Sequence, residues 1–331
     1  MSSRIPMSIP FGWYFVGYSD ELAVDEVRTL NYFNRELVMF RTSSGQVSIL
    51  DAYCPHLGAH LGEGGRVEGE SIRCPFHDWA FDGSGTCTDV PYAKRIPARA
   101  ANGPCTKAYP AVEENGVIWA WYHPQGVAPA FDVLAYPEMN NTDWATHRRL
   151  EWHVSTHPQE ISENAVDIAH FKYVHKMDAV PEGETTYDGV QRRTLAAGTR
   201  KYIDPVSGEE KTTPTRVEAT QNGAGQKLAR FSGLVDLVAM TLVTPVTHDR
   251  CELRLAFAHP KFPEDSFEMR VVEMTIASIS GSTGIEGDIP IWNKKKFQAT
   301  PILCDGDGQI MRYRKYFAQF YCDDEQAVVP S

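Results

Sequence analysis

The first third of the chain alternates short apolar runs with turn residues, which is typical of paired strands. Residues 36–41 and 46–50 are two such runs, and the turn sequence 43–45 between them predicts a hairpin. A second hairpin is predicted where Asn115-Gly116 separates two apolar segments, because both residues tolerate a positive φ. The N-terminal part is therefore expected to be a β domain built from hairpins.

A segment rich in proline and glycine interrupts this pattern at residues 123–129, which is typical of the exit from a domain. The chain has 331 residues and is therefore long enough for two domains. We expect one domain over residues 1–130 and a second over residues 131–331.

The second domain is predicted to combine helices with further strands. Apolar residues recur every three or four positions over residues 159–171, which predicts one amphipathic helix. Residues 187–260 again have the pattern of strands separated by turns, and helical periodicity returns from about residue 264. A final helix is expected over residues 309–321. The predicted fold class is α+β.

Composition narrows the classes of function. The 43 acidic residues outnumber the 32 basic residues and give a net charge of −11, which argues against a nucleic-acid partner. No apolar stretch approaches the roughly 18–20 residues that cross a bilayer. The N-terminus contains Pro6 and Pro10 and lacks the apolar core of a signal peptide. We therefore expect a cytoplasmic protein without an integral membrane segment.

Four residues of the first domain form a metal-binding pattern. Cys54-x-His56 is followed after seventeen residues by Cys74-x-x-His77, so that two tight loops can hold one metal centre. Two thiolates and two imidazoles suit zinc. They equally suit a Rieske [2Fe-2S] cluster, in which two cysteines hold one iron and two histidines hold the other. The ligand types alone leave both alternatives open.

A second candidate metal site begins with His170 and His175. They lie five residues apart, about 140° on a regular helix, so both can bind one metal only if the helix ends or bulges between them. Asp167 lies one turn before His170, where it can orient the imidazole through a hydrogen bond. Two histidines and a carboxylate form a common ferrous-iron site. Spacing does not choose among four candidate carboxylates, Glu286, Asp288, Asp305 and Asp307.

Together the two motifs resemble those of the Rieske non-heme iron oxygenases. Glycines follow the first cysteine loop, and the sequence 78–83 (Asp-Trp-Ala-Phe-Asp-Gly) follows the second, as in the Rieske segment of that family. The pattern D-x-x-H-x-x-x-x-H from Asp167 to His175 resembles its ferrous-iron segment. Residues 287–293 look like the ligand segment of the steroid-acting members, and this likeness assigns the third ligand to Asp288.

The resemblance extends to one branch of the family. Residues 90–97, 305–310 and 316–321 look like those of 3-ketosteroid 9α-hydroxylase oxygenase components and cholesterol 7-desaturases. Respiratory Rieske carriers have an additional cysteine in each ligand loop, where this chain has Ala59 and Phe76. A departure from the oxygenase pattern is Asp78, which replaces a usual glycine. Aspartate tolerates the left-handed conformation, so we expect the loop to be preserved.

This resemblance implies a fold, cofactors and an assembly. The fold would be an N-terminal Rieske antiparallel β domain followed by a catalytic domain with an antiparallel sheet and surrounding helices. Two sets of residues would hold the metals: Cys54, His56, Cys74 and His77 for the [2Fe-2S] cluster, and His170, His175 and Asp288 for Fe(II). The assembly would be a homotrimer in which Asp167 contacts His77 of the partner subunit and links electron transfer to oxygen activation.

The implied activity is that of the terminal oxygenase in a multicomponent monooxygenase system. Such an enzyme uses O2 to hydroxylate or desaturate a hydrophobic steroid- or sterol-like substrate. The chain has no strand–GxGxxG–helix unit for NAD(P)H or flavin, so electrons from NAD(P)H would arrive through a separate reductase, with or without a ferredoxin.

Two other functions stay open from the sequence. The substrate could instead be a smaller aromatic or N- or O-methyl compound that is demethylated or hydroxylated. Alternatively, the chain could be a non-catalytic Rieske electron carrier. Iron content separates the carrier from the enzyme, because the cluster alone supplies about two irons per chain and the oxygenase holds about three.

Overall fold

The computed structural model describes residues 4–176, 183–204 and 207–322, apart from the side chains of His147 and Arg200. The chain divides into two compact units. The N-terminal unit contains residues 13–135, and the C-terminal unit contains the residues up to 12 together with those from 136 onward.

The N-terminal unit is built mainly from short antiparallel strands in three sheets. The first sheet has the order β1 (Gly12–Tyr18), β11 (Val117–Tyr122), β10 (Ala111–Glu114). The second has the order β2 (Val27–Tyr32), β3 (Arg35–Arg41), β4 (Val47–Asp51), β9 (Ala108–Tyr109). The third has the order β5 (Arg66–Glu68), β6 (Ser71–Arg73), β7 (Ala80–Asp82), β8 (Cys87–Asp89). A short helix, α1 (Ala98–Ala101), follows β8.

Both predicted hairpins of this unit are confirmed. Strands β3 and β4 form the first, and β10 and β11 form the second. Asn115 and Gly116 connect β10 to β11 with φ of +60° and +71°. These positive values explain why the Asn-Gly pair predicts the turn correctly.

The third sheet and the β3–β4 hairpin enclose a hydrophobic core that also contains two of the predicted ligands. Phe40, Ile72 and Phe81 are fully buried in this core, and Cys54 and Cys74 are 3% and 2% exposed beside them. Each of the two loops thus directs its cysteine inward, so packed apolar side chains fix the positions of the two thiols.

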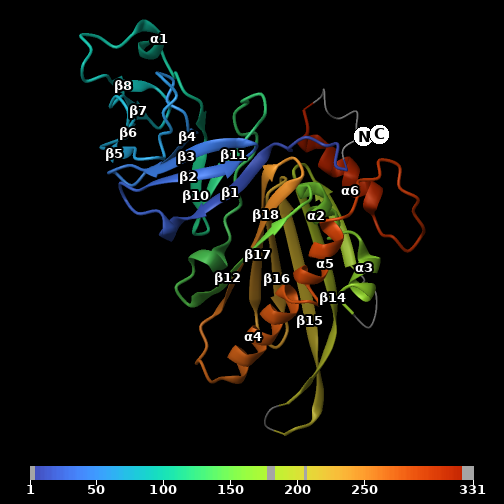
Figure 1. Cartoon of the computed structure of the whole chain (residues 1–331). Coiled ribbons are helices and arrows are strands. Elements are labelled where there is room, and N and C mark those ends of the chain that lie inside the picture. Colours follow the sequence, from blue (N-terminus) through green and yellow to red (C-terminus); the bar gives the residue numbers. More distant parts are fainter. Residues whose placement is uncertain (1–3, 177–182, 205–206, 323–331) are drawn as a thin grey trace. The chain divides into compact units, whose positions relative to one another are not determined.

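The C-terminal unit contains one large antiparallel sheet with helices on one face (Figure 1). Its strand order is β12 (Trp144–Val154), β18 (Arg250–Pro260), β17 (Leu237–Thr247), β16 (Gln226–Ser232), β15 (Glu210–Asn222), β14 (Gln191–Ile203), β13 (Gly183–Asp188). The covering helices include α4 (Phe267–Ser280), through Val272 and Ile276, and α5 (Ile285–Trp292), through Trp292. The predicted strand region and the return to helices are therefore confirmed.

The single helix expected over residues 159–171 is wrong, because the segment forms two short helices. They are α2 (Pro158–Glu163) and α3 (Ile168–Tyr173). Asp167 leaves the helical conformation, with φ −79° and ψ 84°, and its carboxylate accepts a hydrogen bond from His170 N at the start of α3. Aspartate is favoured in such a capping position, and the apolar spacing does not detect it.

The start of α2 is fixed by a buried histidine. His157 Nδ1 accepts a hydrogen bond from Gln159 N (3.1 Å), and its Nε2 bonds the carbonyl of Ser8 (2.8 Å). Since a carbonyl only accepts, the proton of the neutral ring lies on Nε2. Burial lowers the pKa of His157 to about 4, so the ring stays neutral over most of the pH range.

The predicted final helix corresponds to α6 (Ile310–Phe317), which continues into a 3-10 turn (Ala318–Phe320). Its Tyr313 and Phe317 are fully buried, as expected for a helix with aromatic residues on more than one face. Among the described residues, no helix is both long and apolar enough to cross a membrane.

Two candidate metal centres

The two cysteine loops of the N-terminal unit have matching backbone geometry. In each loop the cysteine N–H donates to the carbonyl five residues later, at 2.8 Å for both Cys54 and Cys74. The residue four positions later, Gly58 or Asp78, donates back to the cysteine carbonyl at 2.9 or 3.1 Å. Both of these residues have a positive φ, +76° and +59°. The loops are therefore two copies of one turn.

Asp78 keeps the conformation of the glycine that it replaces, as predicted. Its carboxylate lies 2.7 Å from a guanidinium nitrogen of Arg66 and 3.6 Å from one of Arg73. The hydrogen bond from Arg66 lowers the pKa of Asp78. A charged residue is thus accommodated at a position that requires the left-handed conformation.

The four predicted ligands of this centre lie in two pairs. The thiols of Cys54 and Cys74 neighbour each other, and burial, followed by the effect of Cys74, raises the pKa of Cys54 to about 12. The rings of His56 and His77 have centroids 4.8 Å apart. His77 Nδ1 is buried without a hydrogen-bond partner among the described residues. Two buried thiols, together with an imidazole nitrogen that has no partner in the described part of the chain, fit an iron–sulfur cluster.

The tips of the same loops are apolar and exposed. Leu57 follows His56 and is 65% exposed, and Phe76 precedes His77 and is 62% exposed. Below them Trp79 stacks on the His56 ring, with centroids 4.6 Å apart, and its indole N–H donates to Tyr92 Oη. The histidine side of the centre therefore lies within an exposed hydrophobic surface, which is typical of a docking surface.

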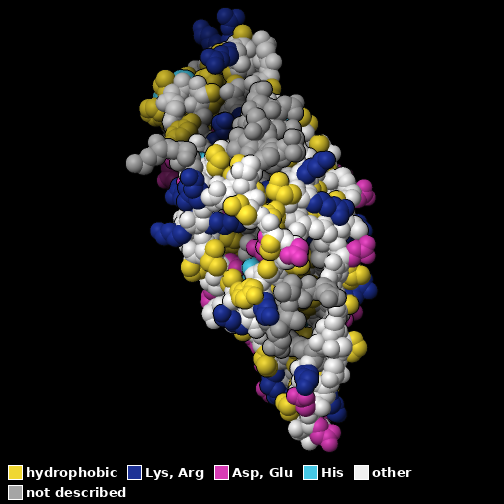
Figure 2. Space-filling model, turned by 90° about the vertical axis from the view of Figure 1, so that its right-hand side faces the viewer, with side chains coloured by type: hydrophobic (Ala, Val, Ile, Leu, Met, Phe, Trp, Pro, Cys, Tyr) yellow, Lys and Arg dark blue, Asp and Glu magenta, His cyan; other side chains and the backbone are white. Residues whose placement is uncertain are grey.

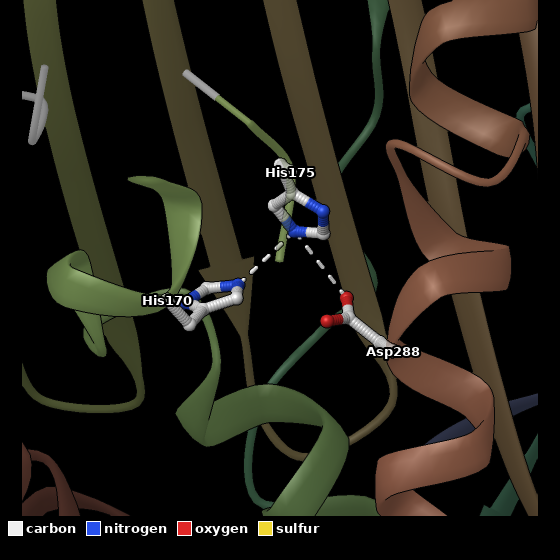
Figure 3. Close-up of side chains that lie close together, drawn as sticks. All are labelled: His170, His175 and Asp288. Atoms are coloured by element: carbon white, nitrogen blue, oxygen red, sulfur yellow. Dashed lines mark hydrogen bonds and ion pairs between the residues drawn. The ribbon is translucent and has the colours of Figure 1, made fainter. Parts of the chain in front are cut away.

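The second centre lies in the C-terminal unit, where His170, His175 and Asp288 converge (Figure 3). His175 Nε2 is 3.1 Å from His170 Nε2 and 3.5 Å from Asp288 Oδ2. Three ligand atoms of these residues lie within 4.8 Å of one another. Two nearby histidines and a carboxylate from a distant segment thus offer two nitrogens and one oxygen to a common point.

The end of α3 explains how both histidines reach this point. The helix stops at Tyr173, two residues before His175, and Lys176 adopts a positive φ of +58°, so the chain changes direction directly after His175. Gly287 faces Val174 at this place, and a Cβ on the glycine would lie 3.4 Å from Val174 Cγ1 and 2.7 Å from the Ser282 carbonyl. The absence of a side chain lets the end of α3 pack against α5 beside Asp288.

The ionisation of the three side chains suits a divalent metal. The His170 ring bonds through Nδ1 to the carbonyl of Asp167, which places its lone pair on Nε2, toward the other two residues. Burial and the neighbouring His170 lower the pKa of His175 to about 4, so its imidazole is neutral. Burial raises the pKa of Asp288 to about 6. Neutral imidazoles and a carboxylate are the donors that ferrous iron takes in such sites.

Matches to known families cover both units. Residues 12–110 match the family described as Rieske [2Fe-2S] domain. Residues 120–321 match the family described as 3-ketosteroid 9α-hydroxylase C-terminal domain. This chain belongs to the Rieske non-heme iron oxygenases. It is accordingly an oxidoreductase with the two kinds of metal centre of that family, and the alternatives of a zinc site and a non-catalytic carrier are set aside.

Curated relatives of this Rieske oxygenase match it over nearly its whole length. The 3-ketosteroid-9-alpha-monooxygenase oxygenase component of Rhodococcus rhodochrous is 31% identical, over 98% of this chain and 84% of the relative. A cholesterol 7-desaturase of Xenopus laevis is 30% identical, over 99% of this chain and 75% of the relative. The branch predicted from the sequence is therefore confirmed.

Solved structures support the fold. Dicamba monooxygenase bound to 3,6-dichlorosalicylic acid superposes with a TM-score of 0.74 at 18% identity, covering 93% of this chain and 96% of that one. The Pseudomonas putida CBB5 NdmA mutant with caffeine gives 0.67 at 19% identity, covering 92% and 88%. The predicted α+β fold, a Rieske domain with a catalytic domain, is thus confirmed for this Rieske oxygenase.

The sequence interpretation missed one residue beside the candidate iron centre. Asn164 lies between α2 and α3, where its Oδ1 accepts a hydrogen bond from Trp292 Nε1 (3.2 Å). This contact fixes the amide orientation, and the amide group lowers the pKa of the nearby Asp288 against the effect of burial. No sequence spacing indicates this bridge, because Asn164 and Asp288 come from distant segments.

The other candidate carboxylates lie elsewhere in this Rieske oxygenase. Among the described residues, Asp288 is the candidate grouped with the two histidines. Asp307 accepts a hydrogen bond from Cys304 N and thus stabilises its own loop. A separate exposed group contains His153, Glu151 and Glu252, and both of its carboxylates pair with Arg254. The space-filling view in Figure 2 shows histidine atoms (cyan) at the surface near the middle of the face, beside hydrophobic and acidic side chains.

Proposed function

We propose that this Rieske oxygenase is the terminal component of a multicomponent monooxygenase system that hydroxylates or desaturates a steroid- or sterol-like substrate. The match of residues 120–321 to the 3-ketosteroid 9α-hydroxylase C-terminal domain carries this proposal. That segment contains all three residues of the iron centre. The names of the relatives, a ketosteroid monooxygenase and cholesterol desaturases, support the same substrate class.

We assign the cluster to a domain over residues 1–130 and the iron to a domain over residues 131–331. Cys54 and Cys74 would hold one iron of the cluster, and His56 and His77 would hold the other. His170, His175 and Asp288 would hold Fe(II). When bound, the cluster transfers electrons one at a time, and the ferrous iron activates O2 at coordination positions that three protein ligands leave open.

The side chains around the iron centre prepare it for this chemistry. The Asp167 carbonyl keeps the proton of His170 on Nδ1, so that Nε2 is available as a ligand. Asn164 orients Asp288 and favours its ionised form. Asp288 is only 3% exposed, so little water is present to screen the attraction between its carboxylate and a metal ion.

We further propose that the enzyme works as a cytoplasmic homotrimer in which Asp167 links two subunits. Its side chain is 38% exposed, so the carboxylate can accept a bond from His77 of the partner subunit. The hydrophobic surface at Leu57 and Phe76 suits such a contact. The name "oxygenase component" of a relative supports a separate reductase, which would bring electrons from NAD(P)H, with or without a ferredoxin.

Substrate-dependent oxygen uptake tests the activity. Iron-loaded protein, a surrogate reductase and NADH would be offered 3-ketosteroids, sterols and small methoxy- or N-methyl-aromatics, with the product masses recorded. We expect uptake with the steroids or sterols, accompanied by the gain of one oxygen or the loss of two hydrogens. Turnover of the small aromatics alone would contradict the steroid proposal and leave the oxygenase assignment intact.

The intersubunit role of Asp167 needs a separate measurement. The Asp167→Asn variant is expected to retain both metals and to transfer electrons from cluster to iron at least about tenfold more slowly, because a neutral amide bonds the partner imidazole more weakly than a carboxylate does. Single-turnover kinetics with a pre-reduced cluster measure this step directly. Iron loss from this variant would show that Asp167 is needed for the site itself and would contradict a relay role.

A further inference from the structure

A polar row crosses the inner face of the large sheet in the C-terminal unit. Strand register pairs Arg192 of β14 with Gln221 of β15, and Gln221 with Lys227 of β16. Lys227 is paired in turn with Thr241 of β17. Neighbouring strands are about 4.8 Å apart, so Arg192 and Lys227 leave the sheet roughly 10 Å from each other.

This row lies on the face that the helices cover. Side chains alternate between the faces of a strand, so Lys227 shares its face with Phe231, and Thr241 shares its face with Ala239 and Val243. Phe231 and Ala239 belong to the core beneath α4. Val243 belongs to the core beneath α5, the helix that carries Asp288. The row is therefore on the iron side of the sheet.

The middle of this covered face is more accessible to solvent than other positions on it. Lys227, Ala229 and Thr241 are half-buried, although they lie on central strands, whereas Leu237 and Val243 on the same face are at most 1% exposed. Ala229 and its register neighbour Ala239 are also small. Accessible surface on the covered side of central strands indicates a hollow between the sheet and its helices.

Two cations adjoin this hollow without a carboxylate. Arg192 is 2% exposed and donates to Thr194 Oγ1 (2.8 Å) and Gln221 Oε1 (3.4 Å), both neutral acceptors. Gln221 Oε1 also accepts from Tyr313 Oη. Lys227 Nζ has no hydrogen bond or ion pair with any described residue. Cations away from solvent are normally paired with an acidic group, so this arrangement suits an anionic ligand.

The electrostatics of Lys227 agree with this interpretation. Burial, followed by the positive charge of Arg192, lowers the pKa of Lys227 to about 7. The ammonium form therefore costs free energy at this position, and a carboxylate placed beside it would restore that form. Thr241 adds a neighbouring hydroxyl that can donate a hydrogen bond to the same carboxylate.

We propose that Lys227, with Thr241 beside it and Arg192 behind it, binds a carboxylate of the substrate. This inference rests on the proposed function and makes it more specific. The substrate would be a steroid-like acid whose apolar body fills the hollow over Ala229 and Ala239, and whose anionic end lies at the polar row.

Binding to a matched pair of compounds tests this subsite. The probes are a 3-ketosteroid with a side-chain carboxylic acid and the methyl ester of the same acid, titrated calorimetrically into wild-type enzyme loaded with its metals. We expect the acid to bind at least about tenfold more tightly than the ester, as for a partly buried charge pair. In Lys227→Met the ratio of the two affinities should fall to about one, and in Lys227→Arg it should be largely retained.

Further variants control for folding and for general charge effects. Lys201 lies on the same sheet, is exposed and pairs with Glu210 at 2.7 Å, so Lys201→Met should keep the wild-type ratio. Lys227→Gln provides a second test if the methionine variant does not fold. Thr241→Val is expected to lower the preference for the acid about threefold, the effect of one hydrogen bond.

The outcomes separate this inference from the proposed function. Equal binding of acid and ester to the wild-type protein overturns the carboxylate subsite and leaves the steroid proposal standing. An unchanged acid preference in folded Lys227→Met or Lys227→Gln overturns it as well. Failure of both steroids to bind overturns the proposed function and this inference together.

Discussion

The two metal centres are assembled in different ways. All four proposed cluster ligands lie within 24 consecutive residues, from Cys54 to His77, on two loops with the same hydrogen bonds. The proposed iron centre instead joins His170 of the six-residue helix α3, and His175 just beyond its end, to Asp288 on another helix, 113 residues beyond His175. The first site is determined locally, and the second depends on how α3 and α5 pack.

This difference predicts that the two metal centres respond differently to substitutions. A locally determined site is lost when a ligand is lost and changes little when distant packing changes. A site assembled from distant helices is also sensitive to residues that carry no ligand atom, such as Asn164 and Gly287. Substitutions at His170, Asn164 and Asp78 test this contrast.

The largest effect is expected from removal of one iron ligand. His170→Ala should reduce turnover by at least about a thousandfold, because ferrous iron then has only one imidazole and one carboxylate. The visible spectrum of the cluster should not change, since its ligands lie in the other unit. Iron content and absorbance measured on the same sample check both statements, and Cys74→Ser is the reciprocal control. Loss of the cluster spectrum in His170→Ala would break the contrast.

An intermediate effect is expected from the bridge at Asn164. Asn164→Leu removes the hydrogen bond to Trp292 and the polar group that lowers the pKa of Asp288, and iron affinity should fall by about 10–100-fold, as for other residues that orient metal ligands. Iron titration of the metal-free second centre measures this affinity. Asn164→Asp is a matched control that adds a negative charge at similar side-chain size. Wild-type affinity in the leucine variant would show that α5 alone fixes Asp288.

The smallest effect is expected from Asp78 in the second cysteine loop. A β-branched residue is poorly suited to φ of +59°, so Asp78→Val should lower the free energy of unfolding by about 1–2 kcal/mol. Asp78→Gly relieves the backbone and should cost less. Denaturant unfolding of the cluster-loaded protein compares the two. Equal losses would assign the effect to the ion pairs with Arg66 and Arg73 instead of the backbone.

The same distinction between local geometry and long-range packing explains which features the sequence predicted. The cysteine loops, the Asn115-Gly116 hairpin and the tolerance of Asp78 depend on short-range geometry, and the sequence predicted each of them. The break between α2 and α3 was missed, because Asp167 caps a helix without disturbing the apolar period. Spacing did not select Asp288, and a family resemblance was needed. Asn164 and the row from Arg192 to Thr241 appear only when strand register and helix packing are known.

The neutral ring of His157 has a consequence for how the enzyme tolerates acid. In the unfolded chain this histidine takes up a proton near pH 6.5, whereas in the folded protein it does so only near pH 4. Between these values the unfolded chain binds more protons, so acidification draws the equilibrium toward unfolding, and the stabilising effect present above pH 6.5 fades as the pH falls. Protonation of Nδ1 would also place two N–H groups face to face at the start of α2. His157 therefore makes the C-terminal unit, which carries the proposed iron centre, less stable during storage and assay in mildly acidic buffer.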